Sequence, residues 1–195
     1  MELGAQKMER GLRVKQCKAE KQRLREEILK KLQSQSPQER ARKSKLIKEK
    51  VFSLLQFQKA EKVGFYASKE EEVDTWEMME EVIFSKKIAL PYLHKGEILL
   101  SYIQSLKGLR KGVYGIYEPC SPNTPIDPNE LEIIIVPGVA FDLLNNRLGR
   151  GKGYYDRLLK RTLQTFKLGL GFDFQIVERL PVEENDVRVD KVITN

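Results

Sequence analysis

The spacing of apolar residues in the first part of the chain is helical. Over residues 18–33, Leu24, Ile28, Leu29 and Leu32 fall on one face of a helix with 3.6 residues per turn. The positions between them are mostly charged or amide-bearing. This stretch therefore predicts an amphipathic helix that turns one face to a core.

Two capping-box patterns predict where further helices begin. In the segment Ser36 to Glu39, a serine stands three residues before a glutamate, and a proline occupies the first helical position. We expect this helix to run to about Leu55. Asp74 and Glu77 have the same spacing and predict the start of a third helix.

Beyond residue 60 the apolar runs become shorter and richer in β-branched residues. The segment Leu131 to Val136 is almost wholly apolar, as expected for a central strand buried on both faces. The segment Gly108 to Pro128 is rich in Gly, Pro and Asn and predicts a long surface loop. The other predicted strands are Lys62 to Ala67, Lys87 to Leu90 (ending at Pro91), Glu97 to Gln104, Phe166 to Phe172 and Val187 to Ile193.

Strands that alternate with helices indicate an α/β domain with a largely parallel sheet. We expect a three-layer, Rossmann-like fold, with a mostly parallel mixed sheet flanked by helices on both faces and a basic N-terminal helical pair. In such sheets, ligands bind beyond the carboxyl ends of the strands. The glycine-rich segment that follows Val136 falls at that position.

The net charge of +7 is concentrated in the N-terminal region. Residues 1–50 contain 16 Lys and Arg against 7 Asp and Glu, whereas the other 145 residues contain 19 against 21. A basic region attracts nucleic acid, a membrane surface or an anionic small ligand, or is simply a solvated helix. Charge alone does not decide among these.

Composition excludes several classes of protein. No apolar run approaches the roughly 20 residues that span a bilayer, and the charged start lacks a secretory signal. One histidine and two unpatterned cysteines leave no set of ligands for a typical zinc site. We therefore expect a cytoplasmic protein without a disulfide framework.

The clearest chemical signal lies in the segment Arg147 to Asp156, RLGRGKGYYD. Three glycines spaced by two let backbone N–H groups approach an anion, and the cations between them supply positive charge. A helix predicted from Tyr154 to Leu163 adds its N-terminal dipole. The segment therefore predicts a polyphosphate site, although a flexible turn with solubilising charges is the alternative.

Asp156 lies in the first turn of that predicted helix. A carboxylate beside bound phosphates is suited to hold Mg²⁺, directly or through water. The alternative is a favourable charge near a helix N-terminus.

The segment Val136 to Leu159, VPGVAFDLLNNRLGRGKGYYDRLL, resembles the signature of the 5-formyltetrahydrofolate cyclo-ligase family. The resemblance covers nearly the whole chain and implies that residues 18–195 form a single domain and that residues 1–17 are a flexible extension. Asn145 and Asn146 depart from a glycine common in the family, but asparagine also tolerates left-handed conformations. Further matching segments are Lys21 to Arg25, Ser44, Glu72 to Thr75, Gly115 to Pro119, Gln175, Pro181 to Glu183, and Asp186.

The resemblance implies an ATP-dependent ring closure. 5-Formyltetrahydrofolate and ATP become 5,10-methenyltetrahydrofolate, ADP and phosphate, after the formyl oxygen is phosphorylated. Phosphoryl transfer depends mainly on positioning and charge neutralisation. The partners would be these small molecules and neither nucleic acid nor a membrane, and the chain would act as a monomer or weak homodimer.

The resemblance also implies roles for individual residues. Arg150 and Lys152 are the expected catalytic residues, which stabilise charge on the transferring group. Asp156 and Asp186 are the expected Mg²⁺ ligands. Glu72 is expected to contact the folate, together with Arg150, Gly151, Lys152, Gly153 and Tyr154. The expected ATP-binding residues are Lys21, Gln22, Arg23, Leu24, Arg25, Arg147, Leu148, Gly149, Arg150, Gly151, Lys152, Gly153, Tyr154 and Tyr155.

Two other functions stay open at this point. An RNA-binding module would use the basic N-terminal helices as an electrostatic footprint, although no RNP-like or KH-like motif accompanies them. A different nucleotide-hydrolysing enzyme would share the glycine loop but not the folate.

Overall fold

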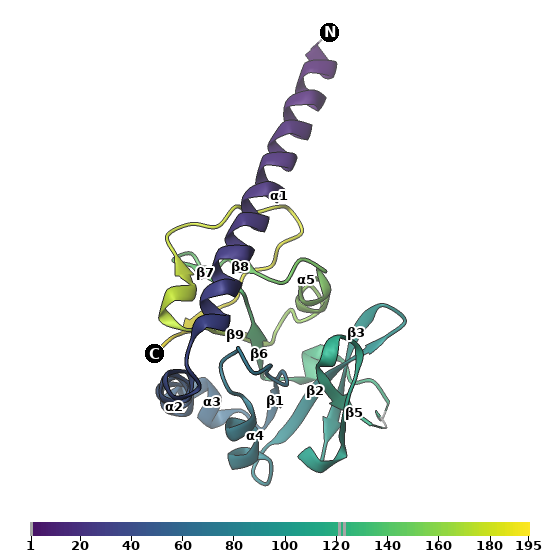
Figure 1. Cartoon of the computed structure of the whole chain (residues 1–195). Coiled ribbons are helices and arrows are strands. Elements are labelled where there is room, and N and C mark those ends of the chain that lie inside the picture. Colours follow the sequence, from purple (N-terminus) through teal and green to yellow (C-terminus); the bar gives the residue numbers. More distant parts are fainter. Residues whose placement is uncertain (1, 121, 123) are drawn as a thin grey trace.

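The computed structural model describes residues 2–120, 122 and 124–195, with side chains described from residue 11 onward. Its centre is a six-stranded sheet in the order β11-β9-β6-β1-β2-β3 (Figure 1). Neighbouring strands are parallel except β2 and β3, which are antiparallel. The six strands are β1 (Lys62–Gly64), β2 (Lys87–His94), β3 (Glu97–Ile103), β6 (Ile133–Pro137), β9 (Phe166–Leu170) and β11 (Lys191–Ile193).

Alternate residues of the central strand β6 enter two separate cores. Ile133 and Ile135 pack in the cluster that contains residues of the first four helices, whereas Ile134 packs with Leu158 and Leu159 of α5. Helices therefore cover both faces of a mostly parallel sheet, as the sequence predicted. The helices are α1 (Glu2–Ser34), α2 (Pro37–Ser53), α3 (Leu55–Lys59), α4 (Trp76–Val82) and α5 (Tyr154–Leu159).

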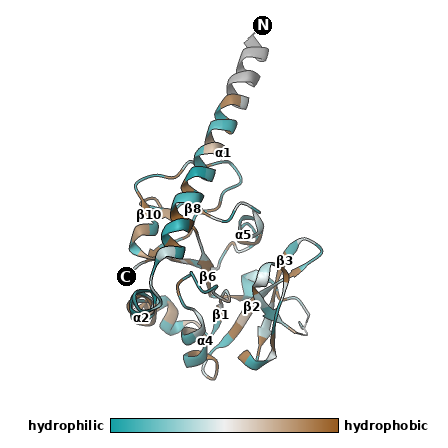
Figure 2. Cartoon of the chain, viewed as in Figure 1, coloured by the Kyte–Doolittle hydropathy of each residue, from teal (hydrophilic) through white to brown (hydrophobic). Residues whose placement is uncertain are grey.

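The hydropathy of the elements follows this layering. Figure 2 shows brown, apolar segments in β2 and β6 and a largely hydrophilic α1. The buried residues of the N-terminal helices lie where the pattern predicted them: Ile28 and Leu32 are buried, and so are Ile47 and Val51. No helix in the described part of the chain is long and apolar enough to cross a membrane.

Helix α1 is longer than the sequence pattern indicated. It begins at Glu2 rather than near residue 18, and Figure 1 shows its N-terminal part extending beyond the rest of the domain. The segment contains no proline, and its residues are mostly good helix formers. The division at residue 17 between a flexible extension and the domain stays a prediction, and Met1 lies outside the described residues.

Both predicted helix starts are confirmed, but only the first has the predicted cap; at the second, Asp74 Oδ1 accepts from Trp76 N–H at 2.7 Å without a capping box. Ser36 Oγ accepts a hydrogen bond from Glu39 N–H at 3.2 Å at the start of α2. Before α4, Thr75 is the N-cap residue, and Glu77 pairs with Lys48 instead of closing a capping box. The Thr75 hydroxyl is buried and donates to Tyr66 O, and it makes no hydrogen bond to the first turn of α4.

Strand β2 continues through Pro91, where the sequence analysis ended it. The pairing of β2 with β1 stops at the pair Gly64–Ala89. Beyond that pair β1 offers no partner to β2, so the missing N–H of Pro91 breaks no hydrogen bond on that side. Strand β2 therefore continues, paired with β3 alone.

The segment 108–128, expected as an irregular loop, contains a two-stranded sheet. Its strands are β4 (Leu109–Lys111) and β5 (Tyr117–Pro119), joined by a turn in which Tyr114 adopts a positive φ of 64°. A second small sheet, in the order β10-β7-β8, was also not predicted; it contains β7 (Ala140–Asp142), β8 (Arg147–Leu148) and β10 (Ile176–Val177).

The turn between β7 and β8 contains the left-handed asparagine that the sequence allowed. Asn145 adopts a positive φ of 62°, which asparagine tolerates better than most residues. Helix α5 ends at Leu159, however, four residues before the predicted end. Its six residues give it a smaller dipole than the sequence analysis assumed.

Candidate functional site

A cavity of about 730 Å³ opens beyond the carboxyl ends of β1 and β6. Its lining residues belong to two chemically different groups. We call one group the apolar wall: Tyr66, Tyr92, Leu93, Ile98, Val113 and Ile116. We call the other the charged wall: Lys21, Arg25, Arg147, Asp156, Glu183 and Asp186. The glycine loop, residues 149–153, lines the same cavity.

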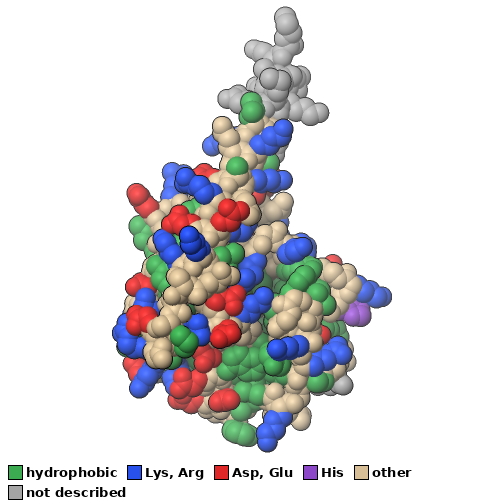
Figure 3. All heavy atoms as spheres, in the orientation of Figure 1, with side chains coloured by type: hydrophobic (Ala, Val, Ile, Leu, Met, Phe, Trp, Pro, Cys, Tyr) green, Lys and Arg blue, Asp and Glu red, His purple; other side chains and the backbone are tan. Residues whose placement is uncertain are grey.

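The two groups come from different parts of the fold. The apolar wall is formed by the end of β1, the β2–β3 pair and the turn that joins β4 to β5. Figure 3 shows green apolar side chains gathered on the side of β3 and β5, and mixed blue and red side chains on the side of α1 and α2. A cavity of this size holds ligands as large as a nucleotide or a folate.

Each glycine of the loop has its own physical requirement. Gly151 and Gly153 have positive φ angles of 97° and 65°. Gly149 does not, but a Cβ atom there would lie 2.7 Å from Arg147 Nη1. Positive φ therefore disfavours larger residues at Gly151 and Gly153, and a side chain at Gly149 would require Arg147 to shift.

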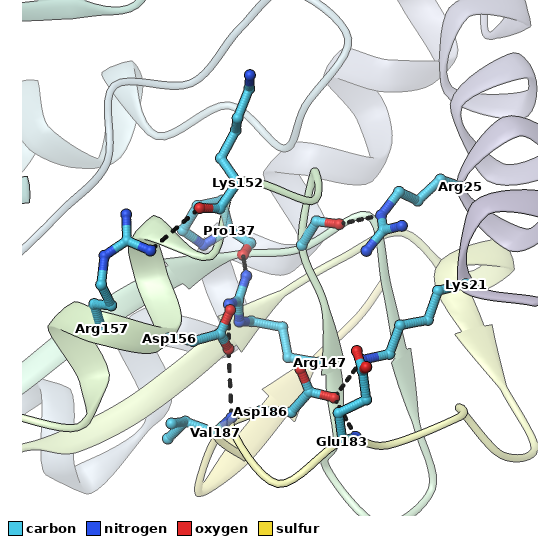
Figure 4. A network of polar contacts seen from close by, with 11 residues as sticks. Lys21, Arg25, Pro137, Arg147, Lys152, Asp156, Arg157, Glu183, Asp186 and Val187 are labelled. Carbon is cyan, nitrogen blue, oxygen red and sulfur yellow. Dashed lines mark hydrogen bonds and ion pairs between the residues drawn. The ribbon is translucent and has the colours of Figure 1, made fainter. Parts of the chain in front are cut away.

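Arg147 is held by the protein itself. Its side chain is 3% exposed, Nη2 lies 3.0 Å from Asp156 Oδ1, and Nη1 donates to Pro137 O (Figure 4). The guanidinium also stacks over the Tyr155 ring at 5.7 Å. Burial raises the pKa of Tyr155 well above its ordinary value, so the phenol stays neutral beside the cation. Arg147 therefore supports the cavity floor and also lines it.

Lys21 joins α1 to the C-terminal segment. Its ammonium lies 2.8 Å from Glu183 Oε2 and 2.5 Å from Asp186 Oδ2. Burial lowers the pKa of Lys21, but the hydrogen bonds to Asp186 and Glu183 outweigh burial and raise it above the ordinary value. Lys21 is therefore a charged side chain that two carboxylates hold at the cavity.

Arg25 connects the same helix to the glycine loop. Its Nε–H donates to Gly149 O at 2.8 Å, and its guanidinium passes close to Gly151. The basic helix thus lies over the glycine loop, as the sequence analysis expected. Figure 4 shows Arg25 and Lys21 extending from α1 toward this network.

Arg150 and Lys152 differ in their partners. Arg150 Nη2 contacts Glu72 Oε1 at 2.7 Å and Glu71 Oε1 at 2.8 Å. Lys152 Nζ has no carboxylate partner among the described residues and lies 5.8 Å from the centre of the Tyr114 ring. Figure 4 shows the Lys152 side chain directed away from the carboxylates.

Tyr154 adjoins the same aromatic side chain. Its ring centre lies 6.5 Å from that of Tyr114, and the guanidinium carbon of Arg157 lies 5.1 Å from the centre of the Tyr154 ring. A hydrogen bond with Tyr114 raises the pKa of Tyr154. The turn at Tyr114 thus contacts the glycine loop directly.

The two predicted metal ligands have one occupied oxygen each. Asp156 uses Oδ1 toward Arg147 and Val187 N–H, and Asp186 uses Oδ2 toward Lys21 and Glu183 N–H. The described residues contain no group of three or more His, Cys, Asp or Glu placed to hold a metal ion. Asp156 and Asp186 therefore each retain one carboxylate oxygen for which the structure shows no hydrogen bond among the described residues.

Three predicted ATP-binding residues do not line the cavity. Gln22 donates to Glu26, Arg23 is exposed, and Leu24 packs against the core. On a helix, neighbours of Lys21 and Arg25 necessarily point elsewhere. Of the expected residues, the cavity lining includes Lys21, Arg25, Glu72, Arg147, Leu148, Gly149, Arg150, Gly151, Lys152, Gly153, Tyr154, Tyr155, Asp156 and Asp186.

Two other segments matched to the family have supporting positions. Ser44 Oγ accepts from Asp74 N–H at 3.1 Å and anchors the segment after β1 to α2. Buried Gln175 donates from Nε2 to the carbonyl oxygens of Gly138 and Val139, where β6 enters the cavity lining. Both residues hold backbone that borders the cavity.

The apolar wall was missed by the sequence reasoning. Tyr92, Leu93 and Ile98 lie on strands that also carry core residues, so hydropathy cannot separate cavity lining from core. The segment Gly115 to Pro119, noticed only through its resemblance, was the available signal, because Ile116 and Glu118 line the cavity.

Comparisons with known proteins identify this arrangement. A model of the 5-formyltetrahydrofolate cyclo-ligase family matches residues 17–195. The mouse 5-formyltetrahydrofolate cyclo-ligase is 32% identical over 187 residues, which cover 89% of this chain and 92% of the mouse protein. The Escherichia coli K12 cyclo-ligase is 34% identical over 142 residues, or 69% of this chain and 78% of that protein.

Solved structures agree with the family match. The NMR structure of Aquifex aeolicus 5,10-methenyltetrahydrofolate synthetase superposes with a TM-score of 0.81 at 40% identity, covering 89% of this chain and 88% of that one. The Mycoplasma pneumoniae 5,10-methenyltetrahydrofolate synthetase gives 0.72 at 27%, covering 89% and 98%. The match spans nearly the whole chain, including the glycine loop and both walls of the cavity, and the chain therefore belongs to the 5-formyltetrahydrofolate cyclo-ligase family.

Proposed function

We propose that this enzyme converts 5-formyltetrahydrofolate and ATP into 5,10-methenyltetrahydrofolate, ADP and phosphate. The observation that carries the proposal is a single cavity with an apolar wall and a charged wall, with the glycine loop lining it. A flat pterin and its formyl group suit the apolar wall, and a triphosphate suits the cationic loop. The two reactants would then meet beside Arg150 and Lys152.

The reaction begins with activation of the formyl group. The formyl oxygen attacks the γ-phosphorus of ATP, the bond to the β–γ bridging oxygen breaks, and ADP leaves. The neighbouring folate nitrogen then attacks the formyl carbon and loses its proton, and the carbon–oxygen bond breaks as phosphate departs. No oxidant or reductant is needed.

Lys152 and Arg150 are the residues that we assign to charge stabilisation. Negative charge spreads over the oxygens of the transferring phosphoryl group, and fixed cations lower its energy. Lys152 suits this task because its ammonium has no carboxylate partner among the described residues. Arg150 already has two such partners and is therefore fixed in direction.

Asp156 and Asp186 would hold Mg²⁺ together with the phosphates. The ion would neutralise part of the charge of the triphosphate. Lys21 and Arg25 would bind phosphate oxygens from the side of α1, in agreement with their positions in the cavity lining.

Two basic residues of α1 are not available to RNA. Lys21 and Arg25 are directed into the protein, where carboxylates and a backbone carbonyl engage them. They are therefore not part of a free basic surface, which non-specific binding of phosphate backbones requires.

The decisive experiment is a turnover assay that follows the methenyl product by absorbance and ADP by a coupled enzyme. We expect product only when ATP and 5-formyltetrahydrofolate are both present, with one ADP released per product. Omission of Mg²⁺ with a chelator should suppress both signals. ADP release that is independent of the folate would contradict the proposal and favour a nucleotide hydrolase.

A further inference from the structure

The glycine loop is joined to the segment after β1 by one arginine and two adjacent carboxylates. Arg150 Nη2 lies 2.7 Å from Glu72 Oε1 and 2.8 Å from Glu71 Oε1. Both carboxylates are largely covered, with exposed side-chain fractions of 17% for Glu72 and 24% for Glu71. Charge-assisted bonds of this length are stronger than neutral ones.

The two carboxylates are not equivalent. Glu72 lines the cavity, and its second oxygen accepts from Lys69 N–H at 3.0 Å. Glu71 is absent from the cavity lining. Glu72 can therefore reach a ligand in the cavity, whereas Glu71 contacts Arg150 from outside it.

A ligand that takes hydrogen bonds from Glu72 must compete with Arg150. If Glu72 were the sole carboxylate partner of Arg150, this competition would leave the guanidinium, whose side chain is 38% exposed, without its charge-assisted bond and so weaken ligand binding. A second carboxylate removes this penalty, because the guanidinium keeps one partner while the other is used.

We propose that Glu71 is a positioning residue that holds Arg150 while Glu72 changes partner from Arg150 to the folate. This inference rests on the proposed function, because it takes Glu72 as the folate contact. Glu71 itself touches neither substrate. Glu71 acts through Arg150, and it lowers the free energy that is needed to separate Glu72 from Arg150.

The neighbouring Glu70 provides a matched control. Its side chain is 90% exposed, and its nearest cation, Arg40, lies 3.9 Å away. Glu71→Gln and Glu70→Gln remove the same formal charge from adjacent positions, so their comparison controls for the change in net charge.

Steady-state kinetics test the proposal. We expect Glu71→Gln to raise KM for 5-formyltetrahydrofolate about tenfold, equivalent to about 1.4 kcal/mol, with KM for ATP within about twofold of wild type. Glu71→Asp should recover part of the loss. Glu70→Gln should match wild type.

A double-mutant comparison separates positioning from a merely structural tether. In an Arg150→Gln background, Glu71→Gln should have no further effect on KM for the folate, because its partner is absent. A structural tether would instead lower the melting temperature and raise KM for both substrates. Equal behaviour of Glu71→Gln and Glu70→Gln, or an undiminished effect in the Arg150→Gln background, would overturn the inference.

Failure of the proposed function has a different signature. If the wild-type protein forms no methenyl product, the proposed reaction is wrong. The contact between Glu71 and Arg150 is then tested by hydrogen exchange alone. We expect faster exchange of the amides of residues 149–153 in Glu71→Gln than in Glu70→Gln, without any substrate. Identical exchange in the two variants would show that Glu71 does not hold Arg150 and the glycine loop.

Discussion

The apolar wall and the charged wall of the cavity are built on different physical principles. The apolar wall uses side chains whose directions are fixed by the antiparallel register of β2 and β3, in which Leu93 pairs with Ile98. The charged wall joins residues that are far apart in the chain: Lys21 contacts Glu183 and Asp186 across more than 160 positions. One wall depends on local strand pairing, and the other depends on tertiary ion pairs.

This difference predicts how each wall responds to substitution. A side chain of the apolar wall can be shortened at the cost of contact area alone. A member of the charged wall cannot be removed alone, because its partner is then left with an uncompensated charge. Substitutions in the two walls should therefore differ in kind as well as in size.

The largest effect is expected at Arg147. Arg147→Ala leaves Asp156 without its cation and opens space in a buried region, and should lower the free energy of unfolding by about 3–5 kcal/mol. Urea unfolding followed by circular dichroism measures this. Arg161→Ala, an exposed arginine just after α5, is the control and should be neutral. An Arg147→Ala protein as stable as that control would show that the charged wall is not held by its ion pairs.

Lys152 should affect turnover without affecting stability. Its side chain is exposed, so Lys152→Ala should leave the thermal melt near that of wild type. Loss of one charge-stabilising group should lower kcat by about 10²–10³-fold. The absorbance assay for the methenyl product checks this. Full activity of the variant would remove Lys152 from its assigned role and leave Arg150 as the remaining candidate.

Asp142 joins the β7–β8 turn to the C-terminal segment, because it accepts hydrogen bonds from Asn146 and from the N–H of Leu180. Burial raises the pKa of Asp142, but these hydrogen bonds outweigh it and hold the pKa below its ordinary value. A carboxylate with a lowered folded pKa contributes stability above its unfolded pKa and loses it as pH falls through the folded pKa.

We therefore expect Asp142→Asn to lower the free energy of unfolding by about 1–3 kcal/mol at neutral pH. The difference from wild type should shrink below about pH 4, where the carboxyl begins to be protonated in the unfolded chain. Urea unfolding of both proteins at pH 7 and pH 3 measures the two differences. A gap that stays constant between these pH values would contradict a role for the ionised form.

The smallest effect is expected in the apolar wall. Leu93→Ala removes contact area without leaving a charge unpaired, and should raise KM for 5-formyltetrahydrofolate about tenfold. KM for ATP should stay near its wild-type value. Leu163→Ala, at a side chain that is 82% exposed, is the control. Equal changes in both KM values would show that the apolar wall does not bind the folate in preference to ATP.

Most of the secondary structure was predictable because its signals are local. The apolar run of β6, the periodicity of α1 and the Ser36 cap all lie within a few residues of the elements they specify. Errors occurred where tertiary partners override local preference. At the start of α4, Asp74 accepts from Trp76 N–H, but Glu77 pairs with Lys48 and no capping box closes. Strand β2 passed through Pro91 because β1 had already ended.

The sequence by itself determined the glycine loop, its cations and the family to which they belong, because backbone freedom and charge are written in residue types. Only the tertiary structure decided which cations have partners. Lys21 is shared by Glu183 and Asp186, Arg150 is shared by Glu71 and Glu72, and Lys152 has no carboxylate partner among the described residues. The physical reason is that Coulomb energy depends on distance and burial in space, and neither can be read from separation along the chain.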